Sequence, residues 1–158
     1  KKQGVKFALE VHPTEIAFDI ASAERALKAV RNHPAFGINY DPSHLMRMGI
    51  DPLRFLREVI GRVYHVHGKD TEILAENQYE YGYEQPPTFG KPIAFGNMAW
   101  RYSIPGQGQV RWVEVMKTLV AAKYKGMVSI ELEDANFNGT EAGEKLGILA
   151  GARYLEGV

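Results

Sequence analysis

The sequence contains no cysteine. This absence excludes disulfide bonds, zinc sites built on thiolates and a thiol nucleophile, and it favours a reducing compartment such as the cytoplasm. No stretch approaches the roughly 18 apolar residues that a membrane span needs, and the first residues do not resemble a signal peptide. We therefore expect a cytoplasmic protein with no membrane partner, while the abrupt start at Lys1 leaves open a part of the protein that precedes it.

An excess of one charge is also missing. Lysine plus arginine and aspartate plus glutamate both number 19, so the formal net charge is zero. A basic excess would attract phosphates from a distance, and its absence argues against nucleic acid as a partner. Apolar residues are plentiful instead: 45% of the 158 residues are hydrophobic, which is enough for the core of one ordinary domain.

Four strand patterns are each followed by a helix pattern. Ser22, Asp51 and Thr140 are expected to cap helices, because their side-chain oxygens accept hydrogen bonds from backbone amides of a first turn. Alternating strands and helices predict a parallel sheet with helical crossovers. Four such units are half of the eight that close a (β/α)₈ barrel. The expected strands span residues 5–11, 36–41, 63–67 and 127–133.

Apolar stripes mark the last two expected helices. One follows the third strand at a distance, and the other follows Thr140 to the end of the chain. Apolar residues three and four apart lie on one face of a helix, so each stripe marks a helix. The first stripe is Val113, Met116, Leu119 and Val120, and the second is Leu146, Leu149 and Leu155.

The segment 68–109 shows no regular pattern. It contains several glycines and prolines, yet it is too aromatic for a plain linker. We expect a long aromatic-rich loop insertion that acts as a lid over a site or packs on a neighbouring subunit. Its aromatic residues are Tyr79, Tyr81, Tyr83, Phe89, Phe95, Trp100 and Tyr102.

Residues with metal-ligand chemistry stand at the carboxyl end of each expected strand: Glu10, Asp41, His67 and Glu131. Parallel barrels keep their active sites at this end. A single such residue is usually a solvated rim or packing residue, but four at successive strand ends rarely arise by chance. Carboxylates with one imidazole form a mainly oxygen site, which suits Mn²⁺, Mg²⁺ or Co²⁺ and also accepts Zn²⁺.

The motifs LEVHPTE, INYDPSHL, HVHGKD and SIELED occur in this order. They resemble the xylose isomerase-like TIM-barrel superfamily, particularly its sugar phosphate isomerase/epimerase branch. The resemblance covers nearly the whole chain. It implies a (β/α)₈ TIM barrel of which residues 1–158 form the carboxyl-terminal half, with strands five to eight and their helices.

The resemblance also implies roles for single residues. Glu10, Asp41, His67 and Glu131 correspond to the ligands of one divalent metal ion, and His44 to a contact with the substrate or a second metal. In the epimerases of this branch, two metal-bound glutamates exchange protons with a sugar carbon through an enediolate. The matching pair is Glu10 and Glu131.

The resemblance weakens after His67. The related epimerases place an arginine shortly after this histidine, whereas here Lys69 follows and the first arginine is Arg101. We therefore expect Lys69 and Arg101 to contact the substrate, with solvated surface charges as the alternative. His65 shares the inward face of His67 and is expected beside the site or in the core.

The implied function is a sugar or sugar phosphate isomerase/epimerase that depends on a divalent metal ion. Two alternatives stay open: a dehydratase of the inosose type on the same metal site, and a non-catalytic fragment or assembly module. An apurinic endonuclease is disfavoured, because Trp100 and Tyr102 stand where its further metal ligands would fall. The sequence leaves open the sugar, the metal and whether the chain forms a homo-oligomer.

Overall fold

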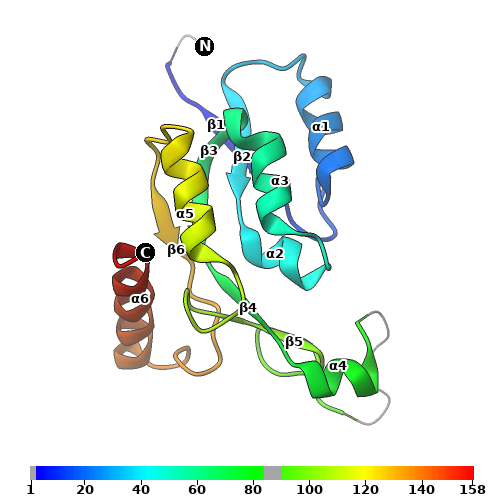
Figure 1. Ribbon diagram of the computed structural model, residues 1–158, viewed down its shortest axis with the longest axis vertical. Coiled ribbons are helices and arrows are strands. Elements are labelled where there is room, and N and C mark those ends of the chain that lie inside the picture. Colours follow the sequence, from blue (N-terminus) through cyan, green and yellow to red (C-terminus); the bar gives the residue numbers. More distant parts are fainter. Residues whose placement is uncertain (1–2, 84–89) are drawn as a thin grey trace. The chain divides into compact units, whose positions relative to one another are not determined.

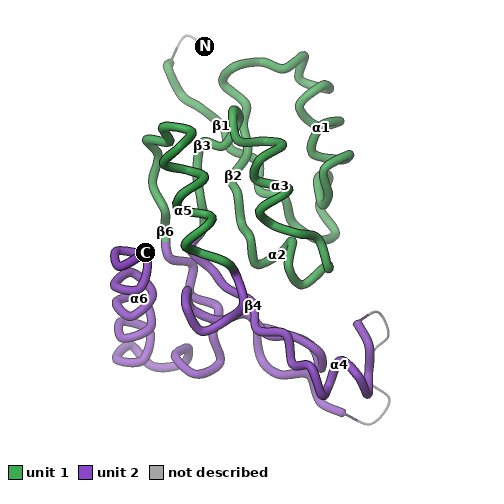
Figure 2. The backbone as a smooth tube through the Cα atoms, viewed as in Figure 1, with its two compact units in different colours: residues 1–67, 111–129 green, residues 68–110, 130–158 purple. Residues whose placement is uncertain are grey.

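The computed structural model describes residues 3–83 and 90–158 (Figure 1). The chain divides into two compact units (Figure 2). The first consists of Lys1–His67 and Arg111–Ser129, and the second consists of Gly68–Val110 and Ile130–Val158. Each unit is thus built from two stretches of chain that are distant in the sequence. Within the described residues, no helix is long and apolar enough to cross a membrane.

A four-stranded sheet has the order β1-β2-β3-β6. The strand β1 pairs in parallel with β2, and β2 pairs in parallel with β3. The sequence predicts all four strands, but the first and the last are shorter than expected, and the last stops directly before Glu131. The strands are β1 (Phe7–Glu10), β2 (Phe36–Tyr40), β3 (Val63–Gly68) and β6 (Val128–Ile130).

The first unit covers one face of its strands with helices. The hydroxyl of Tyr40 donates to the Pro52 carbonyl at 3.0 Å, so Ile38 and Tyr40, both 0% exposed, face this helical layer. Side chains alternate along a strand, which turns Asn39 to the opposite face. The helices are α1 (Ile20–Ala29), α2 (Pro42–Arg47), α3 (Pro52–Val59) and α5 (Trp112–Ala121), with a 3₁₀ turn at Ile60–Arg62.

Helix caps show where the sequence predictions hold. Asp51 caps α3 as expected, since its carboxylate accepts from the amides of the first turn. The prediction that Ser22 caps α1 is wrong. Asp19 is the cap, and Ser22 stands three residues later in a capping box, where the two residues exchange hydrogen bonds. Helix α2 was not predicted, because six residues are too few to show a periodic stripe.

The buried face of α5 includes only part of the apolar stripe that marks this helix in the sequence. Val120 is 74% exposed and Val113 is 39% exposed, whereas Trp112 and Val115 are buried together with the expected Leu119. Apolar residues occupy both sides of this helix, so periodicity does not define one face. The large side chain of Trp112 decides the orientation, because it removes the most apolar surface from water.

The expected long loop 68–109 is in part regular structure. It contains α4 (Ala75–Tyr81) and an antiparallel pair of strands, β4 (Asp70–Ile73) and β5 (Trp100–Ser103). Trp100 and Tyr102 alternate with Arg101, which is a strand pattern, and they pack with Ala99 in a small core. Phe89 lies outside the described residues.

Helix α6 (Glu141–Glu156) ends the second unit, and Thr140 caps it as expected. The expected helix is present, and Leu146 and Leu149 of its apolar stripe are 60% and 53% exposed. Gly147 and Gly151 are buried on the packed face instead. A Cβ on Gly147 would lie 2.9 Å from atoms of the neighbouring loop, so small residues allow the helix to pack closely there.

Candidate metal centre

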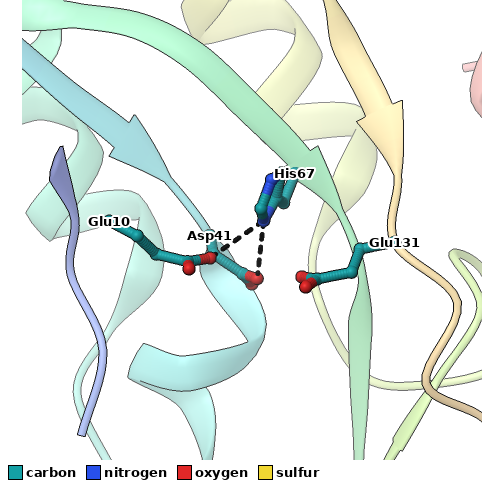
Figure 3. A group of neighbouring side chains, drawn as sticks. All are labelled: Glu10, Asp41, His67 and Glu131. Atoms are coloured by element: carbon teal, nitrogen blue, oxygen red, sulfur yellow. Dashed lines mark ion pairs between the residues drawn. The ribbon is translucent and has the colours of Figure 1, made fainter. Parts of the chain in front are cut away.

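Three candidate ligands belong to the first unit, where neighbouring strands end. Glu10 closes β1, Asp41 follows β2, and His67 stands near the end of β3. Nδ1 of His67 lies 2.8 Å from Oε1 of Glu10 and 3.6 Å from Oδ2 of Asp41, and dashed lines mark both pairs in Figure 3. Parallel strands place their carboxyl ends at one edge of a sheet, which brings these side chains together.

Asp41 has a second role, because it is the amino-terminal cap of α2. Its Oδ1 accepts from the Ser43 amide at 2.8 Å and from the Ser43 hydroxyl at 2.6 Å. The Asp41 side chain is 0% exposed, so these bonds fix its orientation. Its other oxygen, Oδ2, is thereby turned toward His44 and His67. Ser43 was missed at the sequence level, although an aspartate before proline is a helix-start signal.

His44 is brought to the same carboxylates. Its Nε2 lies 3.4 Å from Oδ2 of Asp41 and 3.7 Å from Oε1 of Glu10, and the residue is buried. The ring of His12 meets the ring of His44 edge to face at 4.2 Å. Whether His44 contacts a substrate stays a prediction, but its place beside the candidate ligands is a feature of the fold.

The surroundings of Glu10 favour its ionised form. Burial alone raises the pKa of this carboxyl group, but hydrogen bonds with His44 and His67, together with their charges, outweigh burial. The pKa of Glu10 therefore lies well below its usual range. Burial, and secondarily the charge of the neighbouring His67, lowers the pKa of His65. Both shifts favour unprotonated side chains around His67.

Asn39 holds the other side of the His67 ring. Its Nδ2 lies 3.1 Å from Nε2 of His67, while its Oδ1 is buried and has no hydrogen-bond partner among the described residues. A side-chain flip exchanges the amide oxygen and nitrogen and places Oδ1 within reach of Nε2 of His67. Nε2–H of His67 then donates to Oδ1 of Asn39, and Nδ1, which faces the carboxylates, is the nitrogen that would bind a cation in place of its proton. Metal-binding histidines are oriented in this way.

Glu131 lies in the second unit and has a buried cation beside it. The Lys69 ammonium lies 2.6 Å from Oε2 of Glu131 and 2.9 Å from Oε2 of Glu133. It also lies 4.7 Å from the centre of the Tyr102 ring. Lys69 is 1% exposed, so the alternative reading of a solvated surface charge does not describe it. Its role as a substrate contact stays a prediction.

Arg101 stands opposite Glu72 across the β4–β5 pair, and its Nε lies 2.5 Å from Oε2 of Glu72. The side chain is 29% exposed. It points away from Trp100 and Tyr102, because side chains alternate along the strand. The structure thus gives Arg101 a partner within its own sheet, and its predicted contact with a substrate stays a prediction.

The glycine-rich loop 105–108 surrounds a carboxylate of its own unit. The amides of Gly106 and Val110 donate to Asp70 at 3.0 and 2.8 Å, and the Thr71 amide donates to it at 2.8 Å. A Cβ on Gly108 would lie 2.2 Å from the Asp70 carboxylate, so only glycine allows this approach. The loop therefore has a structural role, because its amides hold the Asp70 carboxylate. The sequence analysis did not single out Asp70.

The four candidate ligands meet the requirements of a cation site. Glu10, Asp41, His67 and Glu131 each offer one ligand atom, and these atoms lie within 4.8 Å of one another (Figure 3). Three carboxylates and one imidazole favour a divalent cation that prefers oxygen, such as Mn²⁺ or Mg²⁺, and Zn²⁺ or Co²⁺ also accepts such ligands. The unpartnered Oδ1 of Asn39 fits a histidine oriented for a metal.

The family model described as "Xylose isomerase-like TIM barrel" matches residues 1–156. The chain belongs to this family. Its four strands, in sequential order across the sheet, are part of a TIM barrel, as the motifs predict. Barrels of this kind place ligands on the carboxyl ends of the strands, where Glu10, Asp41 and His67 stand.

Curated relatives are similar over part of their length. "Uncharacterized protein YfiH" of Bacillus subtilis is 34% identical over 147 residues, which are 92% of this chain and 45% of that protein. The inosose dehydratase of Geobacillus thermodenitrificans is 33% identical over 94 residues, which are 60% of this chain and 29% of the enzyme. This chain thus spans less than half the length of these relatives.

Solved structures show the same fold. The xylose isomerase domain protein of Planctomyces limnophilus superposes with a TM-score of 0.67 at 23% identity, over 99% of this chain and 47% of that chain. The 3-keto-D-glucoside 4-epimerase YcjR of E. coli superposes with a TM-score of 0.61 at 16% identity, over 99% of this chain and 48% of the epimerase. At such identities the likeness establishes the fold alone.

Proposed function

We propose that this chain forms the metal-binding half of a sugar or sugar phosphate isomerase/epimerase. The observation that carries the proposal is the group of Glu10, Asp41, His67 and Glu131, whose ligand atoms lie within 4.8 Å of one another. Relatives and structural neighbours named as an inosose dehydratase and a 3-keto-D-glucoside 4-epimerase support a carbohydrate substrate.

The chemistry explains why such a group is needed. A proton on a carbon next to a carbonyl is weakly acidic, so its removal requires a base within about 3 Å and stabilisation of the oxyanion that develops. A divalent cation held by the four residues would supply the positive charge that stabilises this oxyanion. The carboxylates of the site can then act on the carbon proton.

Glu10 and Glu131 are the proposed proton carriers. Inversion at carbon needs one group that removes a proton on one face and another that returns a proton on the opposite face. Glu10 is held by His67 and His44 in the first unit, and Glu131 is held by Lys69 in the second. Each carboxylate thus has a fixed neighbour that orients it, as a positioned base requires.

The test replaces each glutamate by glutamine in the complete protein. Glu10→Gln and Glu131→Gln should each abolish turnover of the sugar, because an amide cannot accept the carbon proton. Glu15→Gln is the matched control, since Glu15 is exposed and lies five residues from Glu10. Substantial turnover by either variant, measured by chiral chromatography of the products, would refute the assignment.

A dehydratase of the inosose type is the second candidate. The identity of 33% to an inosose dehydratase supports it, although that match covers 60% of this chain. Such an enzyme begins with the same proton removal but then expels a hydroxyl group as water. Proton NMR in D₂O separates the two reactions. Epimerisation in D₂O replaces one carbon proton by deuterium and changes nothing else in the composition of the sugar. Dehydration removes one water, or 18 mass units, and creates a new carbonyl product.

A further inference from the structure

A cavity lies in the first unit, at the ends of the strands opposite to the candidate metal centre. It has a volume of about 390 Å³, which is in the range of sites for small molecules. Its walls come from three segments: Lys6 ahead of β1, four residues around the start of β3, and residues 122–126 between α5 and β6. The four residues are Ile60, Gly61, Val63 and Tyr64. Glu10 and His67 stand at the carboxyl ends of β1 and β3, so this cavity is separate from the candidate metal centre.

The cavity is lined by cations without anions. Lys6, Lys123 and Lys125 are among its lining residues, which include no aspartate or glutamate. The ion pairs found within residues 3–83 and 90–158 include none of these three lysines. Three like charges around one cavity repel each other, and an anion between them would remove this repulsion.

Two tyrosines give the cavity fixed aromatic walls. The hydroxyl of Tyr64 donates to the Pro34 carbonyl at 2.7 Å, and that of Tyr124 donates to the Met127 carbonyl at 2.9 Å. Burial raises the pKa of Tyr124 to about 12, so its ring adds no negative charge. The ammonium of Lys6 lies 4.6 Å from the centre of the Tyr64 ring, which restricts where this charge can be.

Lys123 occupies a backbone position that glycine normally takes. The Lys123 amide donates to the Val120 carbonyl at 2.9 Å, and the Tyr124 amide donates to the Leu119 carbonyl at 3.0 Å. This pattern ends α5 in a Schellman motif, in which Lys123 has a φ of 58°. A side chain is strained there, and residues kept under such strain are often functional. The dipole of α5 favours a nearby cation, but it does not account for Lys6.

We propose that this cavity binds a small organic phosphate. A phosphate monoester carries close to two negative charges and three acceptor oxygens, which matches several ammonium donors. The rings of Tyr64 and Tyr124 can contact an apolar or flat body attached to the phosphate. The volume of about 390 Å³ suits one small molecule. The site is independent of the proposed metal-dependent activity, because none of its residues belongs to the metal centre.

The experiment is a titration of the ¹⁵N-labelled full chain, followed by amide NMR at constant ionic strength. The probes are inorganic phosphate, phenyl phosphate and acetate, and the reporters are the amides of Gly61 and Gly126, which line the cavity. We expect saturable shifts with both phosphates, tighter binding of phenyl phosphate, and no saturation with acetate. Vesicles that contain phosphatidic acid test the lipid form of the same headgroup, and we expect no cosedimentation with them.

Lys123→Gly is the decisive variant, because it removes one charge and relieves the strained backbone. It should melt at an equal or higher temperature than the natural chain and bind phenyl phosphate at least about 10-fold more weakly. Lys117→Gln, an exposed lysine of α5 outside the cavity, should bind normally. Unchanged affinity in Lys123→Gly, equal loss in Lys117→Gln, shifts that do not saturate, or tighter binding to vesicles would each overturn the proposal.

Discussion

The orientation of His67 by Asn39 gives the sharpest test of the metal centre. Asn39 is 7% exposed, and its amide lies 3.1 Å from Nε2 of His67. We predict that Oδ1 of Asn39 accepts from this nitrogen. Asn39→Leu keeps the volume of the side chain but removes the acceptor. Loss of such a partner typically weakens metal binding by about 10- to 100-fold, which is about 1.4–2.7 kcal/mol.

Asn39→Asp is the companion variant, because a carboxylate can accept from Nε2–H but cannot donate. If the predicted orientation is right, this variant should bind Mn²⁺ at least as tightly as the natural chain, while Asn39→Leu binds it more weakly. Asn77→Leu serves as the control. The side-chain amide of Asn77 also donates a hydrogen bond, to the Met98 carbonyl, but this residue lies in the second unit. Isothermal titration with Mn²⁺ at neutral pH measures the three affinities.

Two results would refute this reasoning. An affinity of Asn39→Leu within a factor of two of the natural chain would mean that Asn39 does not orient His67. Equal losses in Asn39→Asp and Asn39→Leu would mean that Asn39 acts as a donor, which leaves Nδ1 protonated toward Glu10. The melting temperature with and without Mn²⁺ checks each titration independently, because a bound ligand stabilises the folded state by an amount set by its affinity.

Two stability predictions concern carboxylates that hold backbone amides. Asp51→Ala removes the cap of α3 and the ion pair with Arg111, and should lower the unfolding free energy by about 1 kcal/mol in urea. Burial raises the pKa of Asp51, but the hydrogen bonds that it accepts outweigh burial and lower the pKa below 3.8. The difference in unfolding free energy between the natural chain and Asp51→Ala should therefore vanish as the pH falls through this lowered pKa. Asp70→Asn leaves a backbone amide without its acceptor and should lower the free energy of unfolding by about 1–3 kcal/mol. Hydrogen exchange at the amides of Gly106 and Val110 should become faster, and an unchanged exchange rate would contradict this prediction.

The sequence predicted the features that depend on local patterns. The four strands follow from runs and alternation of apolar residues, and Asp51 and Thr140 cap helices as short-range rules require. The place of Glu10, Asp41 and His67 at strand ends also follows from these local patterns, because strand boundaries and a parallel arrangement fix the edge to which each side chain belongs.

Other features depend on contacts between distant residues and could not be read from the sequence. Lys69 and Glu131 are 62 positions apart, so neither motif contains the information that they form an ion pair. The β4–β5 pair also depends on distant residues, since Thr71 pairs with Tyr102 across a long segment of chain. The exposed Val120 shows a further limit, because an apolar residue on a helix can face solvent when a larger neighbour takes the packed side.

The two oxygens of Asp41 belong to one rigid planar group. One oxygen holds the first turn of α2 through Ser43, and the other faces His44 and His67. A rotation that moves either oxygen moves both, so the start of the helix and the place of His44 within it change together with the carboxylate. A glutamate at this position would reach further by one methylene and could not keep both geometries. The choice of the shorter acid is therefore constrained twice, once by the backbone and once by the imidazoles beside it.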